Sequence, residues 1–197
     1  TAREGLAAVN MALEAGFRVS ADLITAVNGQ DTARDLHTLA STGVGHISVY
    51  NLTIEPYTPF ALRGVQVDEH KEADDYALAN TVLSTYGFER YEVSSHAKPG
   101  ERSQHNQMYW HGAYFVALGP GAAGVVPTAD GSLIGERYTN QLIKHWLAGD
   151  AAERLELSPL QFAEDMLMTG LRTVRGVNLE TLTQRTQIDV FKHYQPL

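Results

Sequence analysis

The chain has 197 residues, 44% of them hydrophobic, which is enough to fill one domain or one domain with a small appendage. Its formal net charge of −8 argues against a general affinity for nucleic acid or an anionic membrane. No apolar run approaches the roughly 18 residues that a membrane span needs, and no signal peptide is visible, so a cytoplasmic protein is expected. The absence of cysteine excludes disulfides and thiolate-bound iron–sulfur clusters within the chain, and the first residue, Thr1, indicates that the natural start lies elsewhere.

The first part of the chain alternates between helical and extended patterns. Apolar periodicity and turn signals predict helices over 2–15 and 31–41 and strands over 18–25 and 46–54. This spacing predicts a parallel sheet with right-handed crossovers. In such sheets the chemistry lies beyond the carboxyl ends of the strands, here from Asp22 onward and from Asn51 to Glu55.

A loop over 55–67 is followed by a long polar helix over 68–86. We expect the charges of its first turns to form a solvated face: Asp68, Glu69, His70, Lys71, Glu72, Asp74 and Asp75. Strands are predicted over 88–95 and 113–118, separated by a short helix over 104–110. A glycine-rich turn over 119–124 follows the second of these strands.

The pattern weakens over 125–137, where Asp130 and Gly131 between two short extended runs indicate a hairpin. Helices are predicted over 139–148, with Thr139 or Asn140 as its cap, and over 158–172, 177–185 and 189–194. We place a domain boundary near Gly149 and Asp150. Residues 1–149 then form the α/β domain, and residues 150–197 form an all-helical module.

The stretch from Tyr91 to Gly124 holds the densest set of chemically capable groups and is interpreted as one wall of a ligand site. His96, His105 and His111 lie in it among aromatic residues, but their spacing matches no standard zinc pattern. A single histidine amid flat aromatic rings suits an axial ligand of a haem iron, although the residue types alone do not make that assignment specific.

Two further features admit more than one interpretation. The segment from Gly119 to Gly124 matches G-x-G-x-x-G, but no helix pattern begins inside it, so a turn that brings backbone close to a ligand, or a purely structural turn, is favoured over a dinucleotide site. Asp22 lies in an otherwise apolar strand. It either caps a neighbouring loop or accepts hydrogen bonds from a cationic or hydroxyl-bearing ligand.

Several segments resemble the HemW/HemN family of radical S-adenosylmethionine (SAM) proteins, which includes oxygen-independent coproporphyrinogen III oxidase. The resemblance extends over nearly the whole chain, and its most specific element, H-N-x-x-Y-W, is typical of the haem-binding HemW branch. The family usually continues D-L-I with Gly-x-Pro-Gly-Gln, where this chain has Thr25 to Gln30. The matching segments are D-L-I at 22–24, S-V-Y-N-L-T-I-E-P at 48–56, Y-E-V-S at 91–94, A-K-P-G at 97–100, H-N-Q-M-Y-W at 105–110, L-G-P-G-A at 118–122, E-D-M-L-M-T-G-L-R at 164–172 and G-V at 176–177.

This resemblance implies a fold and a set of cofactors. The fold would be α/β, with the second half of a partial (β/α)6 barrel of TIM type over 1–149 and the start of a helical C-terminal domain over 150–197. The family uses SAM and a [4Fe–4S] cluster, whose cysteine ligands would lie upstream of Thr1. Matching residue by residue assigns Asp22, Thr53 and Ala123 to the SAM site. It assigns His105, Tyr109 and Trp110 to haem, with His105 as the possible iron ligand.

The first functional hypothesis is therefore part of a HemW-like protein that binds haem and passes it to an acceptor protein. Its alternatives are an oxidase that decarboxylates coproporphyrinogen III, and a structural half-barrel without a ligand that forms a homodimer through open sheet edges. The parent family is an oxidoreductase family, and this cysteine-free stretch is expected to be inactive alone. No nucleic acid partner and no membrane span are expected.

Overall fold

The computed structural model describes residues 1–128 and 135–195, which divide into two compact units, Thr1–Ser103 and Gln104–Leu197. This division falls earlier in the chain than the expected domain boundary near Gly149 and Asp150, which stays a prediction. The chain is of mixed α/β type, as expected. No helix in the described part of the chain is long and apolar enough to cross a membrane.

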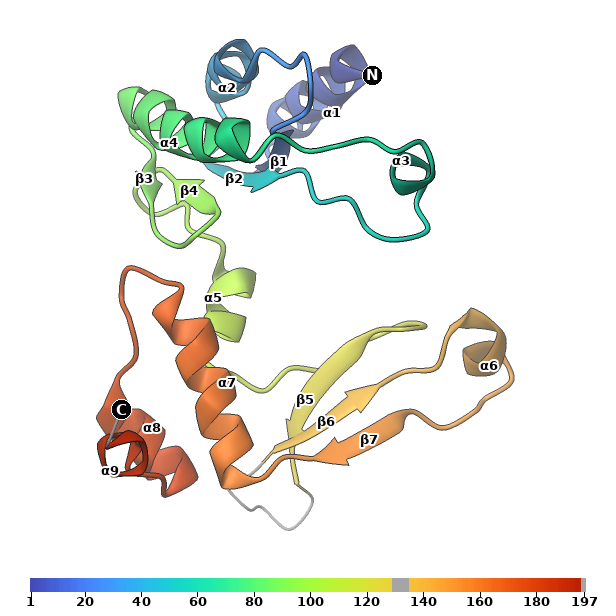
Figure 1. Ribbon diagram of the computed structural model, residues 1–197, viewed down its shortest axis with the longest axis vertical. Helices are drawn as coiled ribbons and strands as arrows, with labels where there is room; N and C mark the ends of the chain where they lie inside the picture. Colours follow the sequence, from blue (N-terminus) through green and yellow to red (C-terminus); the bar gives the residue numbers. More distant parts are fainter. Residues whose placement is uncertain (129–134, 196–197) are drawn as a thin grey trace. The chain divides into compact units, whose positions relative to one another are not determined.

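The first unit is a four-stranded sheet with helices on one of its faces (Figure 1). The strand order is β1-β2-β4-β3; β1 and β2 are parallel, whereas β4 runs antiparallel to both β2 and β3. Among the described strands, β1 pairs only with β2. The elements are α1 (Ala2–Glu14), β1 (Ser20–Thr25), α2 (Thr32–Ala40), β2 (His46–Asn51), α3 (Pro59–Leu62), α4 (Glu69–Thr85), β3 (Glu89–Arg90) and β4 (Ser95–Ala97).

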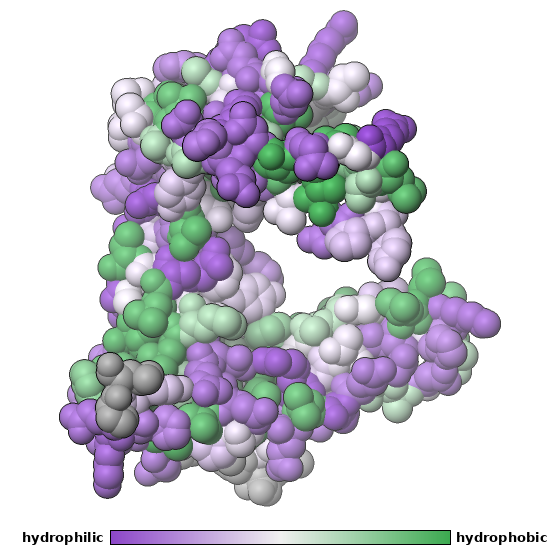
Figure 2. Space-filling view, in the orientation of Figure 1, coloured by the Kyte–Doolittle hydropathy of each residue, from purple (hydrophilic) through white to green (hydrophobic). Residues whose placement is uncertain are grey.

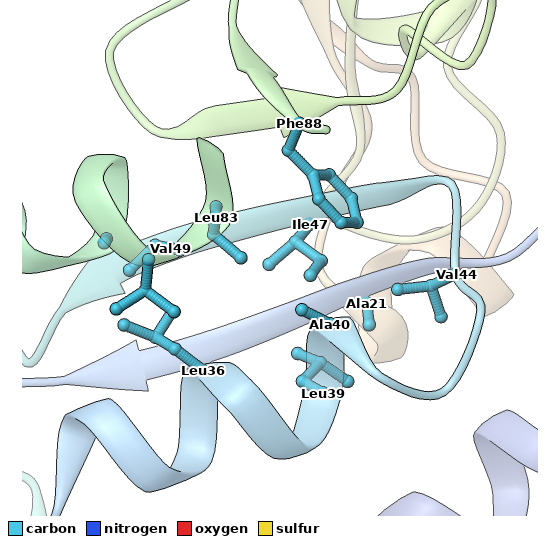
Figure 3. Packing of buried hydrophobic residues seen from close by; sticks show 11 residues of the cluster. Ala21, Leu36, Leu39, Ala40, Val44, Ile47, Val49, Leu83 and Phe88 are labelled. Carbon is cyan, nitrogen blue, oxygen red and sulfur yellow. The ribbon is translucent and has the colours of Figure 1, made fainter. Parts of the chain in front are cut away.

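The core of this unit lies between the sheet and α1, α2 and α4. Figure 3 shows Leu36 of α2 and Leu83 of α4 directed toward Ile47 and Val49 of β2. Because strand side chains alternate between faces, Ala21 and Leu23 of β1 join the same core. Side-chain caps define the helix starts: Asp31 accepts the N–H of Arg34 and Asp68 accepts those of His70 and Lys71.

The prediction of one continuous strand over 88–95 was wrong. The chain turns back between β3 and β4, so that Glu89 faces Ala97 across an antiparallel pair. The N–H of Tyr91 donates to the carbonyl of Ser95 at 3.1 Å, and the Glu92 carboxylate accepts the N–H of Ser94 at 3.1 Å. These bonds close a turn that the apolar pattern alone does not reveal. The parallel arrangement predicted for the sheet therefore holds for β1 and β2 only.

The second unit is a three-stranded antiparallel sheet followed by helices (Figure 1). The hairpin expected around Asp130 and Gly131 exists as β5 paired with β6, although those two residues lie outside the described part. The elements are α5 (Gln104–Trp110), β5 (Ala123–Pro127), β6 (Gly135–Thr139), α6 (Ile143–Leu147), β7 (Glu153–Glu156), α7 (Pro159–Leu171), α8 (Leu179–Thr186) and α9 (Val190–Tyr194).

Three expectations for this unit were wrong. The strand expected over 113–118 is reduced to one isolated bridge between Phe115 and Val125. A neighbouring strand is replaced at Ala117 by the Tyr138 hydroxyl, which accepts the Ala117 N–H at 2.7 Å and donates to its carbonyl at 3.2 Å. The helix expected over 139–148 begins only at Ile143, since the N–H of Asn140 donates to Ala122 and its amide to Gly119. The tail is not all-helical, because β7 pairs with β6.

His96 of β4 is 2% exposed, and neither of its ring nitrogens has a hydrogen-bond partner in the described structure. Burial and the nearby Arg90 lower the pKa of His96 to about 4. Protonation of His96 is therefore unfavourable in the folded state. The free energy of unfolding is highest above pH 6.5 and decreases as pH falls toward 4, with a loss of roughly 2 kcal/mol at pH 5.

We expect His96→Leu to flatten this acid dependence and to raise stability most at pH 5. Urea unfolding of the variant and the parent at pH 8 and pH 5 measures the effect. The exposed His70→Leu serves as the control and should leave the dependence unchanged. Parallel pH profiles for the parent and His96→Leu would contradict the prediction.

Candidate functional site

The face of the first sheet that the helices leave uncovered carries both polar and apolar side chains. Alternation along β1 directs Ser20, Asp22 and Ile24 to this face, where Asp22 is exposed and Ile24 is 54% exposed. Ser48 of β2 lies opposite Asp22 in the parallel register. The expectation that β1 is apolar on both faces was therefore wrong. The Asp22 carboxylate is not a costly buried charge and is available to a ligand.

A chain of hydrogen bonds lies beside Asp22. The Ser20 hydroxyl is 2.7 Å from Nδ1 of His46, and Nε2 of His46 is 2.8 Å from the Tyr91 hydroxyl, which accepts the N–H of Ser103 at 3.3 Å. Burial lowers the pKa of His46 and outweighs the opposing effect of the Asp22 and Glu92 carboxylates. His46 therefore stays neutral at neutral pH, and Ser20 is held in a fixed orientation two residues before Asp22.

The other two residues assigned to SAM lie elsewhere. Thr53 is exposed in the loop after β2, in the same unit as Asp22. Ala123 is exposed at the first position of β5, in the second unit. The structure thus puts Asp22 on β1 and Thr53 just after the neighbouring strand β2, and their assignment to a common SAM site with Ala123 stays a prediction.

His105 and Tyr109 lie one helical turn apart on α5 and contact each other edge to face, with ring centres 4.8 Å apart. Tyr109 makes a second edge-to-face contact with Phe115 at 4.5 Å. His105 is exposed. The three rings line a cleft of about 410 Å³, together with Met108, Tyr114, Val116, Val126 and Pro127. We call this cleft the His105 cleft.

Trp110 does not line the His105 cleft. It lines a second cleft of about 390 Å³, with His111, Met166, Gly170, Arg175, Gly176, Val177, Asn178 and Thr181. The guanidinium of Arg172 lies over the indole ring, 4.2 Å from its centre. The structure therefore brings His105 and Tyr109 together, as expected, and separates Trp110 from them. We call this second cleft the Trp110 cleft.

The three histidines of the central stretch do not gather into a metal site. His96 is in β4 of the first unit, whereas His105 and His111 open onto different clefts of the second unit. No group of three or more potential metal ligands occurs within 1–128 and 135–195.

The glycine-rich turn has a structural explanation. Gly124 of β5 lies opposite Tyr138 of β6, and a Cβ at position 124 would approach the Tyr138 ring within 2.7 Å. Gly119 and Gly121 have φ values of +98° and +71°, which favour glycine. A strand, not a helix, begins inside the motif, so the turn lacks the helix N-terminus of a dinucleotide site.

Asp75 was wrongly expected to lie on a solvated face. It is 4% exposed and accepts hydrogen bonds from the N–H of Ala26 at 2.9 Å, the Thr32 hydroxyl at 2.8 Å and the Lys71 ammonium at 3.0 Å. The helical phase could have revealed this, since Asp75 shares a face of α4 with Ala79 and Val82, both of which are buried. The carboxylate fixes the loop that follows β1.

Comparison with known proteins identifies the family. Residues 157–197 match the model of the HemN C-terminal domain. The chain is 36% identical to the heme chaperone HemW of Synechocystis over 88% of its length, and 33% identical to the mitochondrial radical S-adenosyl methionine domain-containing protein 1 of Danio rerio over 81%. It also resembles the heme chaperone HemW of Lactococcus lactis, with 30% identity over 92% of the chain.

The chain belongs to the HemW/HemN family. Its fold matches that of coproporphyrinogen III oxidase (HemN) from Escherichia coli, a radical SAM enzyme, with a TM-score of 0.74, 16% identity and 98% of this chain covered. The α/β fold predicted from the HemW/HemN resemblance is thereby confirmed. The chain spans about half the length of these proteins: 44% of the Synechocystis protein, 40% of the Danio rerio protein, 50% of the Lactococcus lactis protein and 49% of the HemN structure.

Proposed function

We propose that this chain contributes the haem-contacting surface of a HemW-type haem chaperone, with His105 as the iron ligand. The observation that carries the proposal is the pair of edge-to-face contacts that Tyr109 makes with His105 and with Phe115, all three of which line the His105 cleft. A neutral imidazole is a common axial ligand of haem iron, and aromatic side chains pack well against a flat macrocycle.

The remaining lining of the His105 cleft fits the same ligand. It is mostly apolar, and its volume of about 410 Å³ is in the range of sites that bind small organic molecules. His105 is exposed, so its ring can approach a metal without rearrangement of a core. Tyr109 would restrict the orientation of the imidazole through the edge-to-face contact. Trp110 lies in the other cleft and would support α5 without contacting haem.

The similarity to haem chaperones favours this function over the oxidase alternative. The curated relatives named above are 30–36% identical and include two described as heme chaperones, whereas the oxidase structure is 16% identical and supports the fold alone. A haem-acceptor protein is the partner that a chaperone requires. Homodimer formation is a further prediction of the sequence, and the edge of β1 that pairs with no other described strand supports it.

SAM and a [4Fe–4S] cluster are also part of the proposed function. Asp22 would accept hydrogen bonds from a hydroxyl or ammonium of SAM on the uncovered face of the sheet, with Thr53 nearby and Ala123 as a backbone contact. The chain has no cysteine, so thiolate ligands of a cluster would come from polypeptide outside it. Reductive cleavage of SAM is the chemistry that such a cluster supplies when it is bound.

Haem titration tests the proposal. We expect the chain to bind haem at 1:1 stoichiometry with a saturable shift of the Soret band, and His105→Ala to weaken binding by about tenfold or more because the iron loses its protein ligand. His70→Ala, which removes an exposed histidine from α4, is the matched control and should bind as the parent does. Equal affinities and spectra for the parent and His105→Ala would remove His105 as the ligand.

A further inference from the structure

The Trp110 cleft carries groups that the proposed haem function does not use. It shares no lining residue with the His105 cleft. Arg175 is the single fully charged side chain in its lining; it is exposed and has no ion pair or hydrogen bond in the described structure. His111, also exposed, has no side-chain partner there either.

The indole N–H of Trp110 also lacks an acceptor among the described residues, but it is buried, so a ligand in the cleft does not reach it without a rearrangement. The accessible donors of the cleft are the Arg175 guanidinium and the His111 ring. A guanidinium donates hydrogen bonds and accepts none, so Arg175 selects a ligand that brings acceptor atoms and negative charge.

The rest of the lining indicates the kind of anion. Met166, Val177 and the Trp110 ring supply apolar surface, so the cleft can bury carbon atoms as well as a charged group. Asn178 caps α8 by accepting the N–H of Thr181, and both residues face the cleft, which puts the positive end of this helix at its rim. A fully hydrated inorganic ion would leave the apolar surface unused.

We infer that the Trp110 cleft is a binding site for a small organic carboxylate, with Arg175 as the partner of the carboxylate group and His111 as a second donor. The apolar part of the ligand packs against Trp110, Met166 and Val177. This site is separate from the proposed haem site, and the two can be tested independently.

Tryptophan fluorescence provides the readout. The chain contains two tryptophans, so Trp146→Phe leaves Trp110 as the single reporter. Phenylacetate is the probe, and phenylacetamide, which has nearly the same shape without the charge, is its control. We expect phenylacetate to change the Trp110 emission saturably, and phenylacetamide to bind about tenfold more weakly or not at all.

Matched variants locate the binding. In the same background, Arg175→Ala should weaken phenylacetate binding by about tenfold or more, whereas Arg63→Ala, which removes an exposed arginine at the end of α3, should not. Haem binding through His105 should be unchanged in Arg175→Ala. Absence of a saturable signal, equal binding of acid and amide, or equal binding by Arg175→Ala and the parent would overturn the inference. The comparison of phenylacetate with phenylacetamide tests the inference even if Arg175→Ala does not fold.

Discussion

Replacing Asp75 with asparagine is expected to destabilise the protein by about 3 kcal/mol. The carboxylate is buried and accepts bonds from Ala26, Thr32 and Lys71. An amide of the same size loses the charge that balances Lys71 and presents a donor where only acceptors are needed. Ala26 has a φ of +59°, a left-handed conformation that is unfavourable for alanine, so loss of its bond to Asp75 also releases the loop after β1.

Urea unfolding followed by far-ultraviolet circular dichroism measures this loss. Asp74→Asn is the matched control, because Asp74 is the neighbouring carboxylate on α4 and is exposed. It should change stability by less than about 0.5 kcal/mol. Equal midpoints for the two variants would show that the Asp75 bonds contribute no more than a surface charge.

The effect of Asp75→Asn also depends on pH in a defined direction. Burial alone would raise the pKa of Asp75, but the bonds from Lys71, Ala26 and Thr32 outweigh it and lower that pKa below its ordinary value. The stabilisation is therefore complete above the unfolded-state pKa of about 4 and is lost as pH falls through the lower folded-state value. The difference between parent and variant should shrink only in strong acid, below the range in which His96 titrates.

Gly124→Ala should cost about 3 kcal/mol and act on the second unit. The new methyl group would lie 2.7 Å from ring atoms of Tyr138, closer than side-chain carbons approach one another. Tyr138 is buried, and its hydroxyl bonds both the N–H and the C=O of Ala117. Displacement of the ring would therefore break these bonds and release the segment between α5 and β5. Trp110 fluorescence during urea unfolding in the Trp146→Phe background measures the loss of stability.

A double-mutant cycle separates steric conflict from a general intolerance of alanine at position 124. In a Tyr138→Val background the ring is absent, and the added methyl group should cost less than about 1 kcal/mol. A cost that is unchanged in this background would show that the backbone at Gly124, and not the Tyr138 ring, requires glycine.

The regular elements were largely predictable from periodicity and caps. The first four elements, α1, β1, α2 and β2, agree with the predicted ranges within a few residues, because an apolar pattern marks each of them and a capping side chain marks the start of both helices. In the segments whose secondary structure was predicted wrongly, side chains form the hydrogen bonds that backbone groups would form in a regular strand or helix. Tyr138 bonds Ala117, Asn140 bonds the glycine turn, and Glu92 closes the turn before β4. The contacts of Tyr138 and Asn140 join residues 21 positions apart and leave no local periodicity in the sequence, whereas the Glu92 contact is local and is not visible in the apolar pattern.

The candidate site was predictable only in part. The spacing of His105 and Tyr109 puts both on one helical face, and the structure joins them as expected. Trp110 follows Tyr109 directly, which turns its side chain by about 100° around the helix and away from this pair. The Ser20–His46–Tyr91 chain connects three different segments and was not predicted. No single one of these segments has a pattern typical of a polar network.

The position of β1 at the edge of the first sheet affects how another polypeptide could bind to it. Its outer side presents the main-chain N–H and C=O groups of alternate residues of a strand without proline or lysine, the residues that commonly protect such edges. One of these groups, the Ile24 carbonyl, already accepts a bond from the Gln30 amide at 3.0 Å. An additional strand could bind there through backbone groups alone, so the choice of partner would depend on strand length and direction more than on side-chain identity. Binding at this edge would therefore tolerate side-chain substitutions that would disrupt binding in the clefts of the second unit.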